Sequence, residues 1–138
     1  PAVYKAYVRF AGRYLQTEKS IEVMEKAQSR WPKDVAVLAL LAQEYKNRTR
    51  TDKAVETYES MLALLDKPVT TEDRVWSKNG VLLEIAELHA SGDKAKAKEA
   101  LGRIELKSLE ASDAMRAGAL YGRIEEYDLG IAAYQRAA

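Results

Sequence analysis

One amphipathic pattern recurs along the sequence at an interval of about 34 residues, and this recurrence narrows the possible folds more than any other feature. The pattern is clearest over residues 35–65, where apolar residues at three- and four-residue spacing form two stripes. Such spacing is typical of amphipathic helices, and a polar break at residues 47–52 separates the stripes. This segment is therefore predicted to form a helical hairpin, with similar hairpins before and after it.

Four copies of the hairpin align, at about residues 1–34, 35–68, 78–110 and 111–138. Small and aromatic residues keep their register in these copies, most clearly in the second and the fourth. The matching residues are Ala42, Tyr45, Ala54 and Tyr58 in the second copy and Gly118, Tyr121, Gly130, Tyr134 and Ala137 in the fourth. Small residues let two helices approach closely, while large residues fill the space between neighbouring pairs.

The four copies resemble tetratricopeptide repeats, in which 34 residues form a helix-turn-helix unit. The resemblance covers nearly the whole chain. It implies an all-α fold, a right-handed superhelix of antiparallel helix pairs, in a single domain over residues 1–138. Three residues depart from the family pattern. Val8 and Ile85 are larger than the family prefers at their positions, and Glu84 stands where an apolar residue is expected.

An insertion at about residues 69–77 separates the second copy from the third. Thr70 or Thr71 can cap a helix here, and the acidic residues that follow suit the positive end of the helix dipole. We therefore expect the third copy to begin with an extended helix over residues 72–90. The alternative is a short separate helix over residues 72–78.

The residue types that most catalytic and metal sites need are scarce. Cysteine is absent and His89 is the one histidine, so thiol nucleophiles, disulfides and Cys/His zinc sites lack their side chains. His89 lies near the expected end of a helix, where the helix dipole favours it. Phosphate-binding glycine loops and dinucleotide motifs are missing as well. The sequence predicts a protein that is not an enzyme and that needs no cofactor or metal.

The overall charge and hydropathy also restrict the partners. The chain has 22 Lys and Arg against 21 Asp and Glu, so no global field attracts nucleic acid. No apolar run is long enough to cross a bilayer, and charges throughout the first thirty residues argue against a signal peptide. We expect no nucleic acid and no direct membrane insertion. The absence of cysteine is compatible with the cytoplasm and with a bacterial periplasm, and the initial Pro indicates a piece of a longer protein.

The resemblance further implies that the first helices of the repeats line a concave groove that binds peptides. The family's binding positions, carried over to this sequence, include Lys5, Arg9, Arg13, Gln43, Lys46, Asn47, Leu82, Leu83, His89, Met115, Arg116 and Arg123. None of these positions is acidic, and their basic residues surround a smaller apolar centre. The expected partner is a protein or peptide, with an extended acidic segment around a hydrophobic anchor.

Two further interpretations remain open at this point. The chain could be a structural scaffold segment of a bacterial envelope assembly for secretion or exopolysaccharide export. The apolar face of Ile131 and Tyr134, which a following helix would cover, also predicts self-association through the C-terminal end.

Trp76 in the insertion is expected to be a packing residue rather than an exposed partner anchor.

Overall fold

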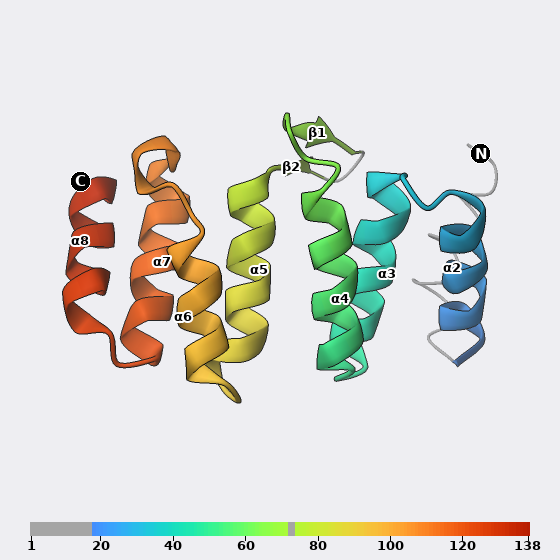
Figure 1. Ribbon diagram of the computed structural model, residues 1–138, viewed down its shortest axis with the longest axis horizontal. Helices are drawn as coiled ribbons and strands as arrows, with labels where there is room; N and C mark the ends of the chain where they lie inside the picture. Colours follow the sequence, from blue (N-terminus) through green and yellow to red (C-terminus); the bar gives the residue numbers. More distant parts are fainter. Residues whose placement is uncertain (1–17, 72–73) are drawn as a thin grey trace. The chain divides into compact units, whose positions relative to one another are not determined.

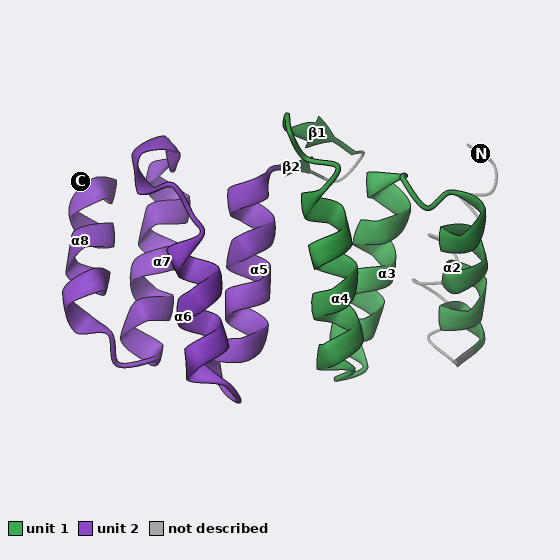
Figure 2. Ribbon diagram, in the orientation of Figure 1, with its two compact units in different colours: residues 1–75 green, residues 76–138 purple. Residues whose placement is uncertain are grey.

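The computed structural model describes residues 18–71 and 74–138. Within them the chain forms seven α-helices, a short 3₁₀-helix and two strands of two residues each (Figure 1). This confirms the all-α fold. The chain divides into two compact units, residues 1–75 and residues 76–138 (Figure 2). The expected first helix of the first repeat, with Lys5, Arg9 and Arg13, lies outside the described residues.

Unit 1 contains the helices α2 (Glu18–Arg30), α3 (Val35–Asn47) and α4 (Thr51–Leu62). Asp34 begins α3 because its Oδ1 accepts hydrogen bonds from the first-turn N–H groups of Ala36 and Val37, at 3.0 and 3.3 Å. Large apolar side chains from all three helices fill the core. They include Met24, Leu38, Leu41, Tyr58 and Met61, none more than 1% exposed.

Unit 2 contains α5 (Lys78–Ala90), α6 (Lys94–Gly102), the 3₁₀-helix η2 (Leu106–Ser108), α7 (Ala111–Arg123) and α8 (Tyr127–Ala137). Short turns join α5 to α6 and α7 to α8, so each pair is antiparallel (Figure 1). Asp93 caps α6 by accepting the N–H of Lys96 at 3.1 Å.

Small residues bring the helices of a pair together, as the sequence predicts. A Cβ atom added to Gly130 of α8 would lie 3.3 Å from the carbonyl oxygen of Gly118 in α7. One added to Gly118 would lie 2.9 Å from the ring of Tyr134. Ala54 in α4 and Ala97 in α6 are fully buried at the corresponding positions. The glycines of the fourth copy thus allow α7 and α8 to approach closely, and the Tyr134 ring covers Gly118.

The first helices α3 and α7 end in the same backbone motif. Thr49 and Glu125 have φ angles of 58° and 66°, in the left-handed region. The N–H of Thr49 donates to the carbonyl of Lys46, and the next N–H, of Arg50, donates to that of Tyr45. These two bonds form the Schellman motif, which satisfies the last carbonyls of a helix and reverses the chain.

The insertion differs from the sequence expectation. Strands β1 (Val69–Thr70) and β2 (Val75–Trp76) pair in a small hairpin, so both the extended helix over residues 72–90 and the short helix over residues 72–78 are wrong. β-branched and aromatic residues favour strands here, and the N–H and hydroxyl of Thr71 donate to the carbonyl of Arg74.

The helix α5 starts only after this hairpin, at Lys78. Ser77 has extended backbone angles, and its hydroxyl accepts the N–H of Gly80 at 3.1 Å, which fixes the N-terminus of α5. Trp76 is 2% exposed, which confirms that it packs into the protein rather than projecting as a partner anchor.

Candidate partner-binding surface

Unit 1 contributes three of the described binding positions, all in the last two turns of α3. Gln43 and Asn47 are exposed and lie one turn apart on the same face of the helix, while Lys46 is half-buried. These side chains form a polar surface next to the turn that leads into α4.

In unit 2, α5 exposes fewer of the predicted binding residues than the sequence suggests. Leu82 is 4% exposed and Leu83 is fully buried, so these two leucines belong to the core and are not exposed apolar contacts for a partner. The reason is that every residue from Gly80 to Ala86 is buried, on all sides of the helix. His89, in the last turn of α5, is half-buried and retains access to solvent.

The helix α7 carries the exposed part of this surface. Met115 is 57% exposed, a high value for a large apolar side chain. Arg116 follows it, with a side chain that is 33% exposed, and the exposed Arg123 lies in the last turn. A separation of seven residues places Arg116 and Arg123 on the same face of a helix, two turns apart. The two guanidinium groups therefore share one face of α7, and Met115 lies on the adjoining side of the helix.

Arg116 is held by two carboxylates of α5. Its Nη2 group donates to Glu87 Oε2 at 2.6 Å and to Glu84 Oε1 at 3.1 Å. Burial alone lowers the pKa of the guanidinium, but the hydrogen bond to Glu87 and the charge of Glu84 outweigh it, so the pKa of Arg116 is raised. The cation is thus firmly charged and is fixed in position between α5 and α7.

These two acids correct the expectation of a groove without acidic residues. Glu84 and Glu87 are neighbours in sequence of the binding positions carried over from the family, and do not belong to those positions themselves. One signal was present in the sequence: Glu84 stands where the family has an apolar residue. A carboxylate at a core position needs a cationic partner, because burying an unpaired charge is costly.

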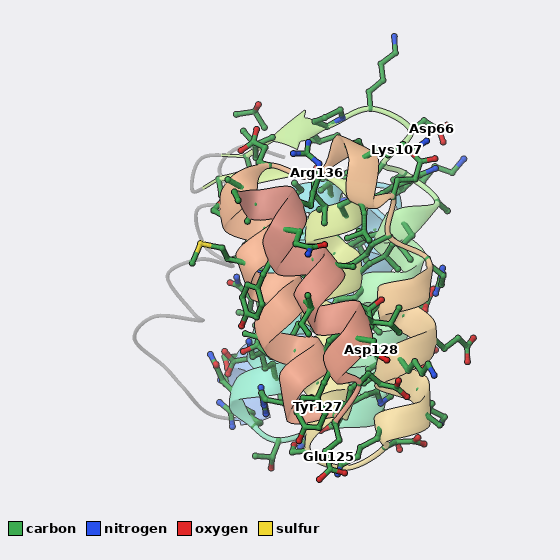
Figure 3. All side chains as sticks on the ribbon, turned by 90° about the vertical axis from the view of Figure 1, so that its left-hand side faces the viewer. Asp66, Lys107, Glu125, Tyr127, Asp128 and Arg136 are labelled. Carbon is green, nitrogen blue, oxygen red and sulfur yellow. The ribbon has the colours of Figure 1, made fainter. Side chains whose placement is uncertain are left out.

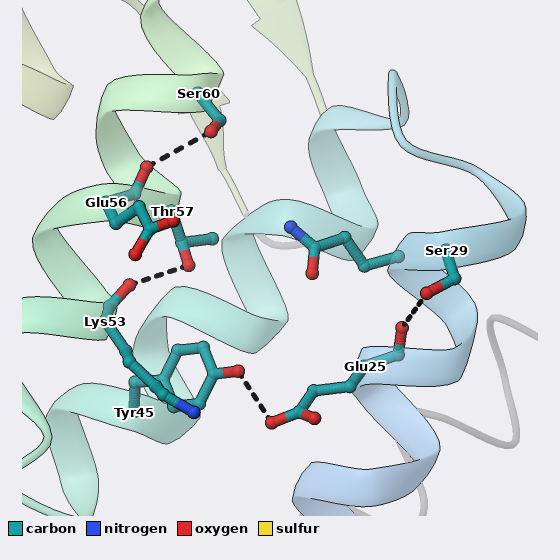
Figure 4. Close-up of a pocket in the computed structure, with 8 residues that line it drawn as sticks. Glu25, Ser29, Tyr45, Lys53, Glu56, Thr57 and Ser60 are labelled. Carbon is teal, nitrogen blue, oxygen red and sulfur yellow. Dashed lines mark hydrogen bonds between the residues drawn. The ribbon is translucent and has the colours of Figure 1, made fainter.

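A polar pocket of about 290 Å³ lies in unit 1, outside the family's binding positions (Figure 4). Its lining residues are Glu25, Gln28, Ser29, Tyr45, Lys53, Glu56, Thr57 and Ser60. The Tyr45 hydroxyl donates to Glu25 Oε1 at 2.7 Å and so joins α3 to α2 (Figure 4). Burial and the hydrogen bond to Glu25 both raise the pKa of Tyr45.

The hydroxyl groups of the pocket also have partners within the helices. Ser29, Thr57 and Ser60 each donate to the backbone carbonyl four residues earlier. The ammonium of Lys53 lies 5.6 Å from the centre of the Tyr45 ring, a cation–π distance. Two of the contacts around this pocket, from Tyr45 to Glu25 and from Lys53 to the Tyr45 ring, link the described helices α2, α3 and α4.

The outer face of α8 is a second exposed surface in unit 2. Tyr127, Ile131 and Tyr134 are 64%, 56% and 48% exposed, and Leu129 is 40% exposed. Arg136 fixes the end of this helix, because its guanidinium donates to the carbonyls of Leu106 and Lys107 in η2, at 3.0 and 3.1 Å. Figure 3 shows Tyr127 at one end of α8 and Arg136 beside Lys107 at the other.

Within residues 18–71 and 74–138, no cluster of three or more histidines, cysteines or acidic residues is arranged to hold a metal ion. In the same part of the chain, no helix combines the length and hydropathy needed to cross a bilayer.

The comparisons with known proteins bear on the fold. No protein-family model matches the sequence, and no curated protein matches it. Two solved structures described as MamA are similar, with TM-scores of 0.59 and 0.64 at 19% and 18% sequence identity. The alignments cover 86% and 99% of this chain, which spans 64% of the first structure and 73% of the second. This likeness shows the fold, an all-α arrangement of tetratricopeptide-like helix pairs.

Proposed function

We propose that the chain is a non-enzymatic protein-interaction module that binds an extended, acidic segment of a partner protein along the first helices of its repeats. The observation that carries this proposal is the exposed Met115, which immediately precedes Arg116 on α7, together with Arg123 on the same face as Arg116. An apolar side chain beside two guanidinium groups suits a partner segment in which carboxylates accompany a hydrophobic residue.

The pairing of Arg116 supports carboxylate binding at this surface. Its guanidinium already accommodates the carboxylates of Glu84 and Glu87, and its side chain remains 33% exposed. The Glu87 side chain is 38% exposed, so a partner carboxylate can compete with it for the same cation. Arg123 is exposed in the last turn of α7, where it can meet a second carboxylate.

The resemblance to tetratricopeptide repeats adds a general expectation, because that family usually binds peptides through its first helices. In unit 1 the corresponding side chains are Gln43, Lys46 and Asn47 at the end of α3. Amide and ammonium groups are hydrogen-bond donors that suit a partner's backbone carbonyls and carboxylates.

The test uses a fluorescent Glu-rich peptide with a central Leu and its Lys-rich counterpart. We expect the acidic peptide alone to bind, and binding to weaken at high salt because exposed ionic contacts are screened. Arg123→Glu should weaken binding roughly tenfold or more, since one charge-assisted hydrogen bond contributes about 1.5–3 kcal/mol. Arg116 is unsuitable for charge reversal, because the change would also disrupt its pairs within the fold.

The matched control is Lys96→Glu, the same change of charge on α6, at a side chain that is 64% exposed. Its affinity for the acidic peptide should stay within twofold of that of the wild type. Met115→Ala should weaken binding without changing its salt dependence, because it removes an apolar contact. Equal effects of Arg123→Glu and Lys96→Glu would show that net charge, and not this surface, governs the interaction.

A further inference from the structure

The exposed apolar side chains of α8 lie in one stripe. Tyr127, Ile131 and Tyr134 are separated by four and then three residues, the spacing that places side chains on one face of a helix. All three are about half exposed or more. Leu129 is 40% exposed as well, but its position two residues from Ile131 puts it on another side of α8.

The helix α6, which is the second helix of the preceding pair, has no such stripe. Lys94 and Lys98 of α6 lie 33 residues before Tyr127 and Ile131. Both lysines form ion pairs with the turn between α7 and α8, at 3.3 Å to Glu125 and 2.9 Å to Glu126. A copy of this ionic contact therefore cannot form on α8, where an aromatic and an aliphatic side chain replace the two ammonium groups.

The α8 stripe reads nearly the same in both directions. An aromatic residue stands on each side of Ile131, at a distance of one helical turn. A twofold interface requires a surface that is complementary to itself, with the same residues contributed by both copies. Two antiparallel α8 helices that cross at Ile131 would place Tyr127 against Tyr134 of the second copy, twice, around a central pair of isoleucines.

The polar residues beside the stripe are compatible with this arrangement. Asp128 and Gln135 flank Ile131 on the same side of α8, three residues before it and four residues after it. In an antiparallel pair the Asp128 carboxylate faces the Gln135 amide of the second copy, a donor and acceptor that can form a hydrogen bond. The nearest arginine, Arg136, is already held by η2 and brings no like charge into the contact.

We propose that α8 is a homodimerisation surface, on which a second copy of this chain packs its own α8 antiparallel about a twofold axis at Ile131. Two contacts hold α8 in place for this interface. Gly130 approaches α7 closely, and Arg136 bonds to η2. The proposal gives a defined geometry to the self-association that the sequence predicts, and it does not depend on the acidic partner of α7.

The first experiment measures the oligomeric state by sedimentation over a range of concentrations. We expect the wild-type chain to form a dimer, and Ile131→Arg to raise the dissociation constant at least tenfold, because it places two guanidinium groups against each other at the axis. Leu129→Arg is the matched control, with the same change of charge and size on another side of α8. It should dimerise like the wild type.

The second experiment tests the twofold axis itself. The chain contains no cysteine, so a single introduced cysteine can report on proximity without background. Under mild oxidation Ile131→Cys should form a disulfide-linked dimer rapidly, because a residue on a twofold axis lies next to itself. Leu129→Cys should stay unlinked.

A wild-type chain that remains a monomer at all concentrations would overturn the proposal, as would a dimer that Ile131→Arg leaves intact. A dimer in which Leu129→Cys cross-links as readily as Ile131→Cys would exclude this axis. If Arg123→Glu still dimerises but no longer binds the acidic peptide, dimerisation through α8 and peptide binding through α7 use different surfaces. The reverse result, loss of the dimer in Arg123→Glu, would contradict the assignment to α8.

Discussion

The guanidinium of Arg116 lies 2.6 Å from the carboxylate of Glu87, and the same Nη2 group lies 3.1 Å from Glu84. These contacts join α7 to α5 across 29 and 32 residues of sequence. The side chain of Glu84 is only 9% exposed. Arg116 therefore has a structural role, in joining α7 to α5, as well as a place on the proposed binding surface.

Removal of this guanidinium should destabilise unit 2. Arg116→Ala takes the cation away from a nearly buried carboxylate, and we expect a loss of about 1–3 kcal/mol in the free energy of unfolding. Glu84→Gln in the same chain should recover part of the loss, because it removes the buried charge. Urea unfolding followed by circular dichroism measures both effects. Lys96→Ala, at an exposed and loose ion pair, should change stability by less than about 0.5 kcal/mol.

The hydrogen bond from Tyr45 to Glu25 predicts a dependence of stability on alkaline pH. The pKa of Tyr45 is raised in the folded chain, by burial first and by Glu25 second. The folded state thus retains the proton when the unfolded state, with a tyrosine pKa of about 10, has lost it. The stabilisation is fully present below pH ~10 and declines as the pH rises above that value.

Comparison of the wild type with Tyr45→Phe isolates this effect. At neutral pH the variant should be less stable by about 1 kcal/mol, the contribution of one hydrogen bond. The difference should narrow in urea unfolding experiments above pH ~10. Tyr121, whose pKa is raised mainly by burial, is present in both proteins and cancels in the comparison. A difference that stays constant up to alkaline pH would contradict the assignment.

The left-handed residue at the end of α3 offers a stabilising substitution. Thr49 has a φ of 58°, which a β-branched side chain disfavours and glycine adopts freely. Thr49→Gly should raise the free energy of unfolding by about 0.5–1 kcal/mol. Thr51→Gly, two residues later in the first turn of α4, should instead lower it by a similar amount. Equal effects at both positions would show that backbone strain at Thr49 is unimportant.

Two glycines of α7 should respond differently to alanine. At Gly122 an added Cβ meets nothing within 4 Å, so Gly122→Ala should be neutral or stabilising by up to about 1 kcal/mol. At Gly118 it would lie 2.9 Å from the Tyr134 ring. Gly118→Ala should therefore be less stable than Gly122→Ala by about 1–3 kcal/mol. Thermal unfolding of the two variants measures this difference, and similar melting temperatures would mean that the ring moves away without cost.

Local sequence patterns were sufficient for the helices and for the turns between them. The spacing of apolar residues predicts the pair α3 and α4, and its recurrence predicts α5 to α8. Small residues such as Gly118 and Gly130 predict the close approach of paired helices. All of these features depend on residues within one repeat, so they are visible in the sequence.

The insertion shows where this reasoning fails. Thr70 and the acidic residues after it satisfy the rules for the start of a helix, yet the described residues on both sides of the turn pair as strands. The choice between a capped helix and a hairpin depended on the bonds between Thr71 and Arg74 and on the cap at Ser77. Propensity alone did not distinguish them, because each residue is compatible with both structures.

By itself, the sequence determined the helical hairpins, their register and the scarcity of catalytic side chains. Only the tertiary structure decided that Leu82 and Leu83 are buried and that Glu84 and Glu87 hold Arg116. The physical reason is that periodicity identifies an apolar or charged face, whereas the burial and charge of that face depend on what packs against it. That neighbour is separated by about one repeat in sequence, as Glu84 is from Arg116.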